Sequence, residues 1–303
     1  MFSEKYDYLN KVLKIQLDAF PDHEKFLDRR LKAVSSDDLE TLNDLAGHVI
    51  KLTGAELSTY AADYAWLCRE QLDEELFFRR NGRYRLSTFA EAYELVYSNK
   101  EYMTRYMNGL LMTQLWWSNH TGVMDYYRTE FLARNPEGYR HLEIGPGHGL
   151  FLYFAAADKR AGAVTGWDIS EASIELTREA LAKLGLEALP SLELQDFFDA
   201  PQAKFDSVVF SEVLEHMEKP LEALRVIQPL LSEEGRLFLN MPINSPAPDH
   251  LFNADSPDAL KAFVESAGFR IESCAYLPAT NQTLEMSLKK KMTVSCVFIA
   301  RPA

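Results

Sequence analysis

Residues 142–149 read Leu-Glu-Ile-Gly-Pro-Gly-His-Gly, and this stretch decides the fold. It continues an apolar run that starts at His141, and it precedes residues 150–157, whose apolar side chains predict a helix. Glycines between a strand and a helix let the backbone turn sharply and let a ligand approach the N–H groups of the first helical turn. The stretch therefore predicts a strand–turn–helix unit that binds a ligand at the start of its helix.

Short apolar runs alternate with helical stretches after this unit. Strands separated by helices indicate a parallel, doubly wound sheet. The last two runs, 269–276 and 293–301, are joined by a polar loop in which we expect no helix, so they favour a C-terminal antiparallel hairpin. We predict an α/β, Rossmann-like domain over residues 135–303. Its first five strands are expected at 141–145, 163–168, 191–196, 205–210 and 235–241.

Residues 1–134 have the apolar spacing of helices and form the second predicted domain. One interruption lies at 76–87, where two short apolar and basic runs flank Asn81-Gly82, a dipeptide typical of hairpin turns. Ser87-Thr88 can cap a helix over 89–97. Helix, helix, hairpin and helix in this order predict a winged-helix-like domain.

Composition argues against a nucleic-acid partner. The chain carries 32 basic and 45 acidic residues, a net charge of −13, which repels phosphate backbones. The second helix of the expected winged helix, 55–66, contains acids but no lysine or arginine. The one basic run, Lys289–Lys291, is interpreted as a solvated loop.

The apolar runs and the start of the chain bear on the cellular compartment, and the cysteine spacing bears on metal or redox chemistry. No run of eighteen apolar residues exists, and the first seven residues have no apolar signal core, so we expect a cytoplasmic protein with no membrane partner. Cys68, Cys274 and Cys296 lack metal or redox spacing and are interpreted as inert thiols.

Three acids accompany the glycine stretch. Glu143 stands two residues before the first glycine, Asp168 lies nineteen residues after Gly149, and Asp196 ends the third predicted strand. An acid at the end of the second strand can accept hydrogen bonds from ribose hydroxyls. The Gly-x-Gly-x-Gly spacing and Asp196 depart from the dinucleotide fingerprint, so a nicotinamide-dependent dehydrogenase is disfavoured.

Together these residues resemble the class I S-adenosylmethionine-dependent methyltransferases, and the resemblance spans residues 141–303. It implies S-adenosylmethionine as the cofactor. The glycines and Glu143 would hold its methionine part, Asp168 the ribose, and Asp196 with Phe197 the adenine. The implied cofactor-binding residues are Glu143, Gly145, Gly147, His148, Gly149, Asp168, Ile169, Asp196, Phe197 and Ser211.

In such methyltransferases the segment corresponding to residues 211–217 lies beside the reacting sulfonium. Glu212, Glu215 and His216 would share one face of a helix and could ligate a divalent cation, as the same pattern does in RNA 2′-O-methyltransferases. We favour a site without metal, because small-molecule methyltransferases, including those of ubiquinone synthesis, have this pattern without requiring metal. His216 is then a candidate general base, which Glu212 or Glu215 would orient.

Two further groups of residues are candidates. The aromatic segment before the glycine strand either fills the core or forms a lid whose rings exclude water and attract the sulfonium. The Pro-rich stretch after the fifth strand faces the ligand side of the sheet. Tyr126 and Tyr127 are named as catalytic candidates beside His216 and Glu212, and Tyr106, Trp117, Asn244, Asp249 and His250 as substrate contacts.

The whole chain is similar to plant- and bacterial-type natural-product methyltransferases, in which the N-terminal domain dimerises and caps the substrate pocket. This similarity implies a homodimer in secondary metabolism that methylates a small metabolite by in-line displacement. Two alternatives stay open. One is an S-adenosylmethionine-consuming cyclase that makes azetidine-2-carboxylate and releases methylthioadenosine; the other is a non-enzymatic winged-helix ligand sensor that would bind DNA.

Overall fold

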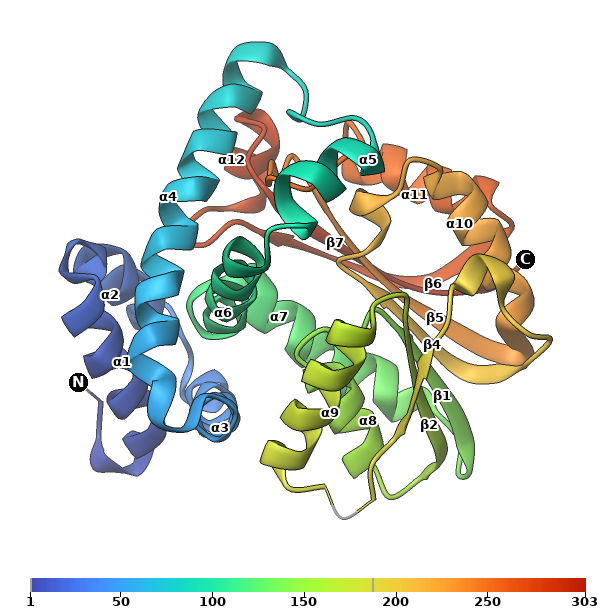
Figure 1. Ribbon diagram of the computed structural model, residues 1–303, viewed down its shortest axis with the longest axis horizontal. Helices are drawn as coiled ribbons and strands as arrows, with labels where there is room; N and C mark the ends of the chain where they lie inside the picture. Colours follow the sequence, from blue (N-terminus) through green and yellow to red (C-terminus); the bar gives the residue numbers. More distant parts are fainter. Residues whose placement is uncertain (1, 187) are drawn as a thin grey trace.

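The computed structural model describes residues 2–186 and 188–303. The chain is mostly helical up to residue 134, and Figure 1 shows these helices standing beside the sheet that the later residues form. The helices are α1 (Asp7–Ala19), α2 (Glu24–Lys32), α3 (Ser36–Thr53), α4 (Leu57–Asn81), α5 (Phe89–Ala92), α6 (Lys100–Trp116) and α7 (Ser118–Tyr126), with π-helical turns at Tyr93–Tyr97 and Tyr127–Phe131.

Local capping explains where several of these helices begin. The Ser35 hydroxyl accepts a hydrogen bond from the Asp38 N–H at the start of α3. Thr88 and Glu91 form a reciprocal capping box at the start of α5, as the sequence predicted for Thr88. The Asn99 side chain accepts from the backbone of α6 in the same way. Each cap satisfies an N–H group that has no partner inside its helix.

The predicted β-hairpin at residues 76–87 was wrong. Helix α4 continues through Phe78 to Asn81 and ends at Gly82, which has φ +69° and whose N–H donates to the Phe78 carbonyl at 2.7 Å. A hairpin turn and a helix C-cap both need a residue at positive φ, so Asn-Gly predicts either one. The residues described between Gly82 and α5 contain no strand, so the winged helix lacks its wing.

The second half of the chain forms one seven-stranded sheet with the order β3-β2-β1-β4-β5-β7-β6. The first five strands pair in parallel, and β7 runs antiparallel to both β5 and β6. This confirms the predicted doubly wound sheet with a C-terminal antiparallel pair. The strands are β1 (Tyr139–Ile144), β2 (Ala161–Asp168), β3 (Ser191–Leu194), β4 (Phe205–Ser211), β5 (Leu231–Ile243), β6 (Phe269–Pro278) and β7 (Val294–Pro302).

One detail of the C-terminal pair differs from the expectation. A short helix, α12 (Leu284–Lys289), lies between β6 and β7, where a polar loop was predicted. Its N-cap is Thr283, whose hydroxyl accepts from the Met286 N–H at 3.3 Å. Six residues are too few to display the apolar period that identifies a helix in a sequence.

Helices cover both faces of the sheet. Those that follow the parallel strands are α8 (Leu150–Ala157), α9 (Glu171–Leu184), α10 (Pro220–Ile227) and α11 (Pro257–Ser266). α8 and α9 pack in the same core cluster as α1 and α3, whereas α10 and α11 pack on the opposite face of the sheet, to the right in Figure 1. No helix among the described residues is both long and apolar enough to cross a membrane.

The hydrophobic core is divided by the sheet. On one face Val209, Phe238 and Val297 pack in the same cluster as Leu45 and Trp116 of the N-terminal helices. The other face packs against α10 and α11 in a separate cluster. The helical half therefore shares a core with one face of the sheet, and the division into domains 1–134 and 135–303 stays a prediction.

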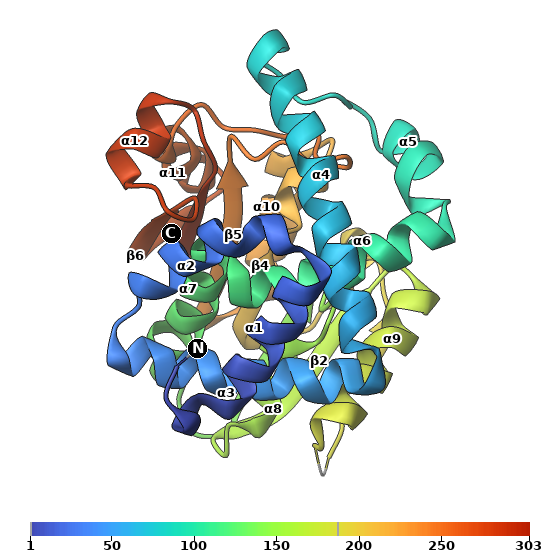
Figure 2. The ribbon, with the colours of Figure 1, turned by 90° about the vertical axis from the view of Figure 1, so that its left-hand side faces the viewer.

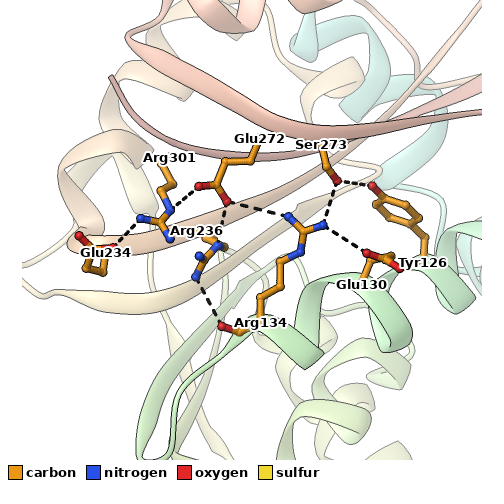
Figure 3. Close-up of polar contacts among 8 residues, drawn as sticks. All are labelled: Tyr126, Glu130, Arg134, Glu234, Arg236, Glu272, Ser273 and Arg301. Carbon is orange, nitrogen blue, oxygen red and sulfur yellow. Dashed lines mark hydrogen bonds and ion pairs between the residues drawn. The ribbon is translucent and has the colours of Figure 1, made fainter.

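A group of charged side chains joins the two halves at the edge of the sheet, around Glu272 of β6 (Figure 3). The Glu272 carboxylate lies 2.9 Å from Arg236 Nε and 2.6 Å from Arg301 Nε. Arg134, at the end of the helical half, approaches it at 4.0 Å. Tyr126 shares a hydrogen bond with Ser273, the neighbour of Glu272. The junction between the helices and the sheet is thereby held by polar contacts in addition to the shared core.

Candidate active site

The predicted site residues follow the carboxyl ends of the parallel strands. β1 and β4 are neighbours, and the chain leaves them toward opposite edges of the sheet, which makes this the topological switch point where ligands bind in open α/β sheets. The segments that reach this edge are 145–149 after β1, 168–169 at the end of β2, 196–198 after β3, 211–216 after β4 and 244–250 after β5.

The loop after β1 has the backbone that the glycines predict. Gly145, Gly147 and Gly149 have φ of +71°, +49° and +71°. A Cβ on Gly145 would also lie only 3.1 Å from the Val213 side chain. Other residues are strained at such φ values. The loop leads directly into α8, so the free N–H groups of that helix point toward a ligand at the switch point.

Glu143 lies under this loop, at the end of β1. Its side chain is buried, and its Oε2 has no hydrogen-bond partner. Burial raises the pKa of the Glu143 carboxyl well above its usual value. A buried acid without a partner is costly in the ionised form, and a bound ammonium group would remove that cost. The position therefore suits the amino group of the cofactor's methionine part.

Asp168 and Asp196 provide carboxylates at the next two strand ends. Asp168 accepts a hydrogen bond from the Ser170 N–H at 2.9 Å, and burial raises its pKa. Ile169, its neighbour, leaves 63% of its surface exposed, which is unusual for a large apolar side chain. Asp196 is exposed and accepts from the Phe198 N–H at 2.9 Å. These features fit a ligand with diol, amino and apolar parts, as a nucleoside has.

Phe197 is not placed as the resemblance implied. Its ring is buried in the core, stacked on Phe198 at 4.5 Å and packed edge-on against Phe210 at 5.6 Å. Phe198 is the more exposed ring, with 38% of its surface accessible. Residues 197–199 form one turn of 3-10 helix, and the sequence pattern does not show which of the two neighbouring rings such a turn buries.

His148 connects the glycine loop to the helical half. Its Nε2 lies 2.7 Å from the Met107 carbonyl of α6. A carbonyl only accepts, so Nε2 carries the proton, and burial lowers the pKa of this imidazole. His148 is therefore a neutral hydrogen-bond donor that ties the loop to α6.

A second polar cluster lies after β4, where residues 214–216 form a single 3-10 turn instead of the expected helix. Glu212 adopts φ +54°, and its carboxylate accepts from Asn240 Nδ2 at 2.7 Å. Burial raises the pKa of Glu212 to about 7. Glu215 is fully buried, and neither carboxyl oxygen has a hydrogen-bond partner. Burial, followed by the charge of Glu212, raises the pKa of Glu215 well above its usual value.

Two histidines complete this cluster. His216 Nδ1 lies 3.1 Å from the Asp249 carbonyl oxygen, and His250 Nδ1 lies 2.6 Å from the Ser245 carbonyl oxygen. Each Nδ1 therefore carries a proton and each Nε2 keeps its lone pair. The rings meet edge to face at 4.9 Å. One nitrogen of each ring and a carboxylate oxygen of Glu215 all lie within 4.8 Å of one another.

Asp249 holds this cluster against the helical half. Its buried carboxylate accepts from Tyr97 Oη at 3.0 Å and from Tyr106 Oη at 3.2 Å, and it lies 3.5 Å from His216 Nδ1. Burial alone would raise the pKa of Asp249, but His216, His250 and the two hydroxyls hold it below its ordinary value. The π-helical turn ending at Tyr97 and helix α6 thus form one side of the site.

The structure brings some of the remaining candidates to the site and leaves others away from it. Tyr106 lies in the second cluster, and Asn244 begins the loop after β5 with φ +49°. Tyr127 is fully buried and donates to the Phe151 carbonyl, whereas Tyr126 reaches Ser273. Trp117 donates to Tyr64 Oη at 3.2 Å. The aromatic segment therefore serves partly as core, as one of its two interpretations stated.

Tyr97 and Tyr84 contribute to the site and were missed. Tyr84 Oη donates to Asn253 at 3.1 Å and accepts from the Ser245 N–H at 3.0 Å, so it fixes the loop that carries His250. Both tyrosines lie in segments assigned to a hairpin or an ordinary helix. Their aromatic character was the only available signal.

A family model described as a methyltransferase domain matches residues 116–274, more than half of the chain. The chain belongs to this methyltransferase family. Membership confirms the predicted Rossmann-like fold and the predicted cofactor, S-adenosylmethionine.

Relatives of this methyltransferase match only part of its length. It is 30% identical over 105 residues to a ubiquinone biosynthesis O-methyltransferase of Alkalilimnicola ehrlichii, covering 34% of this chain and 42% of that protein. It is 35% identical over 111 residues to the protein of the same name from Dinoroseobacter shibae, covering 36% and 44%. The matched parts thus span less than half of these two relatives.

A solved structure extends the similarity into the helical half. The mitomycin 7-O-methyltransferase MmcR aligns with 89% of this chain and 76% of its own, with a TM-score of 0.52 and 18% identity. At this identity the likeness concerns the fold.

Proposed function

We propose that this protein transfers a methyl group from S-adenosylmethionine to an oxygen atom of a small-molecule acceptor. The observation that carries the proposal is the pairing of two sites across the switch point. One holds glycines and acids suited to the cofactor, and the other, after β4 and β5, is a buried polar cluster with no role in the hydrophobic core. The names of the curated relatives support an oxygen acceptor.

On the cofactor side, each residue has a defined task. Glu143 would bind the ammonium group, Asp168 the ribose hydroxyls and Asp196 the adenine amino group, since carboxylates accept hydrogen bonds from all three. The free N–H groups at the start of α8 would receive the cofactor's carboxylate. When bound, S-adenosylmethionine supplies a methyl group activated for in-line attack.

On the acceptor side, the protein supplies orientation and shelter from water. Tyr97 and Tyr106 close the cluster from the helical half, so an acceptor between the two sites is held away from bulk solvent. Asp249 fixes the orientation of His216. The lone pair on His216 Nε2 then serves either as a general base or as a ligand.

We further propose that residues 1–134 act as a cover domain through which two cytoplasmic copies associate. Figure 2 shows the last turns of α4 extending beyond the other helices. Leu72, Tyr93 and Leu95, in α4 and the turn after α5, each expose more than half of their surface, and burial of such side chains favours association. Size-exclusion chromatography with light scattering tests this: a monomer at all concentrations would contradict it.

Product analysis tests the main proposal. The purified protein is incubated with S-adenosylmethionine alone and with a small-molecule extract, and products are identified by mass spectrometry. We expect S-adenosylhomocysteine only with extract, together with an acceptor heavier by one methylene. The Asp168→Ala variant, at a limiting cofactor concentration, should form less of both products. Methylthioadenosine formed without extract would indicate the cyclase instead, and an intact cofactor in both mixtures would contradict an enzymatic function.

A further inference from the structure

We propose that Glu215, His216 and His250 together bind one divalent transition-metal cation. The inference rests on the proposed function only for the use of the cation, which would polarise an acceptor oxygen next to the methyl donor. It gives His216 the role of a ligand instead of a general base. It also revises the set that the sequence indicated, because His250 replaces Glu212.

The first argument is the unpartnered carboxyl of Glu215. This carboxyl is completely buried without a hydrogen-bond partner, and Glu212 and Asp249 add negative charge beside it. Among the described residues no lysine or arginine forms an ion pair with any of the three. A buried acid in this setting is stabilised by a proton or by a cation. A bound cation would give the Glu215 carboxylate a partner and offset the neighbouring charges.

The second argument is the orientation of the two histidines. Both direct Nδ1 to a backbone carbonyl, of Asp249 for His216 and of Ser245 for His250. Histidines that bind metals typically donate their other ring N–H to a carbonyl or carboxylate, which fixes the tautomer and the ring plane. Because Nδ1 of His250 donates to the Ser245 carbonyl, Nε2 of this ring keeps a lone pair that can bind a cation. Tyr84 Oη holds the Ser245 end of this loop through the Ser245 N–H.

The third argument is the composition of the cluster. Two imidazoles and one carboxylate whose ligand atoms lie within 4.8 Å of one another suit Zn²⁺, Mn²⁺ or Fe²⁺ more than Ca²⁺ or Mg²⁺, which prefer oxygen ligands. Three protein ligands also leave coordination positions open for an acceptor. Glu212 stands apart, because its carboxylate is already engaged by Asn240.

Metal binding is measured on the full chain without any acceptor. Protein treated with a chelator and desalted is titrated with MnCl₂, and free Mn²⁺ is followed by electron paramagnetic resonance. We expect one site per chain in the wild type and at least a tenfold weaker site in Glu215→Gln and His250→Ala. Glu222→Gln, an exposed acid on α10, is the matched control and should bind Mn²⁺ as the wild type does.

S-adenosylhomocysteine binding, measured by calorimetry on the same samples, separates this inference from the proposed function. Intact S-adenosylhomocysteine binding in the two variants shows that they are folded. No stoichiometric Mn²⁺ or Zn²⁺ site in the wild type, or equal affinity in Glu215→Gln, His250→Ala and wild type, would overturn the cation site. A wild type that does not bind S-adenosylhomocysteine would contradict the proposed function. The Mn²⁺ titration would still decide the cation site independently.

Discussion

The two sides of the site are built in different ways. The cofactor side consists of short segments at the ends of β1, β2 and β3, and its key features belong to single residues: a glycine at positive φ, a buried acid, an acid at a strand end. The acceptor side is assembled from the loops after β4 and β5 and from Tyr97 and Tyr106, more than a hundred residues earlier in the chain. A single substitution on the cofactor side should therefore strongly reduce cofactor affinity. A single substitution on the acceptor side should remove one of several hydrogen bonds and reduce turnover moderately.

The largest effect is expected for Gly145→Val. A β-branched residue at φ +71° is strained, and its Cβ would meet Val213. We expect S-adenosylhomocysteine affinity to fall by more than about a hundredfold, measured by calorimetry. Gly185→Ala is the control: Gly185 also has positive φ, but a Cβ there meets nothing within 4 Å, so only stability should decrease, by about 1 kcal/mol. Equal loss of affinity in both variants would contradict a local role for Gly145.

Asp168→Ala is expected to weaken S-adenosylhomocysteine binding by about ten- to a hundredfold, because charge-assisted hydrogen bonds contribute roughly 1.5–3 kcal/mol. Asp199→Ala, an exposed acid in the turn after β3, should leave the affinity unchanged. If Asp168→Ala bound as tightly as the wild type, the ribose would lie elsewhere.

Glu143 should make cofactor binding depend on pH. Burial raises its pKa well above the usual value, so the free protein keeps this proton to higher pH than an exposed glutamate does. A bound ammonium favours the ionised form; affinity should therefore rise with pH, by up to about tenfold per unit, and level off above the pKa of the free protein. Calorimetry in buffers of different ionisation enthalpy should detect proton release, and Glu143→Gln should abolish it. A flat pH profile in the wild type would show that this carboxyl does not meet the ammonium.

The smallest effect is expected for Tyr106→Phe, which also tests most directly whether the cofactor side and the acceptor side are separable. It removes one hydrogen bond to Asp249, worth about 1 kcal/mol, so turnover with an identified acceptor should fall about five- to tenfold while S-adenosylhomocysteine affinity stays constant. Tyr102→Phe is the matched control, since the Tyr102 hydroxyl contacts Glu70 within the helical half. A loss of cofactor affinity in Tyr106→Phe would mean that the two sides are not separable.

The same contrast explains what the sequence could predict. The glycine loop, Glu143 and Asp168 combine strand, turn and acid within short windows, so the Rossmann-like fold was predictable from local pattern; the roles of these residues on the cofactor side stay a proposal. The C-cap at Gly82 was read as a hairpin because both structures need the same backbone conformation.

The acceptor side was predictable only in part. His216, Asp249 and His250 were recognised as candidates, but the carbonyl partners of the two histidines and the hydroxyls on Asp249 depend on tertiary packing. Aromatic density alone does not reveal which face of a helix meets the site. For this reason three predicted candidates make contacts elsewhere: Trp117, Tyr126 and Tyr127.

Two consecutive residues of α6 touch both sides of the site. Tyr106 donates to Asp249 after β5, while the carbonyl of Met107 accepts from His148 after β1. Because both contacts belong to the same helical turn, α6 bridges the loop after β1 and the loop after β5. The position of this one turn therefore fixes the spacing between the loop after β1 and the loop after β5.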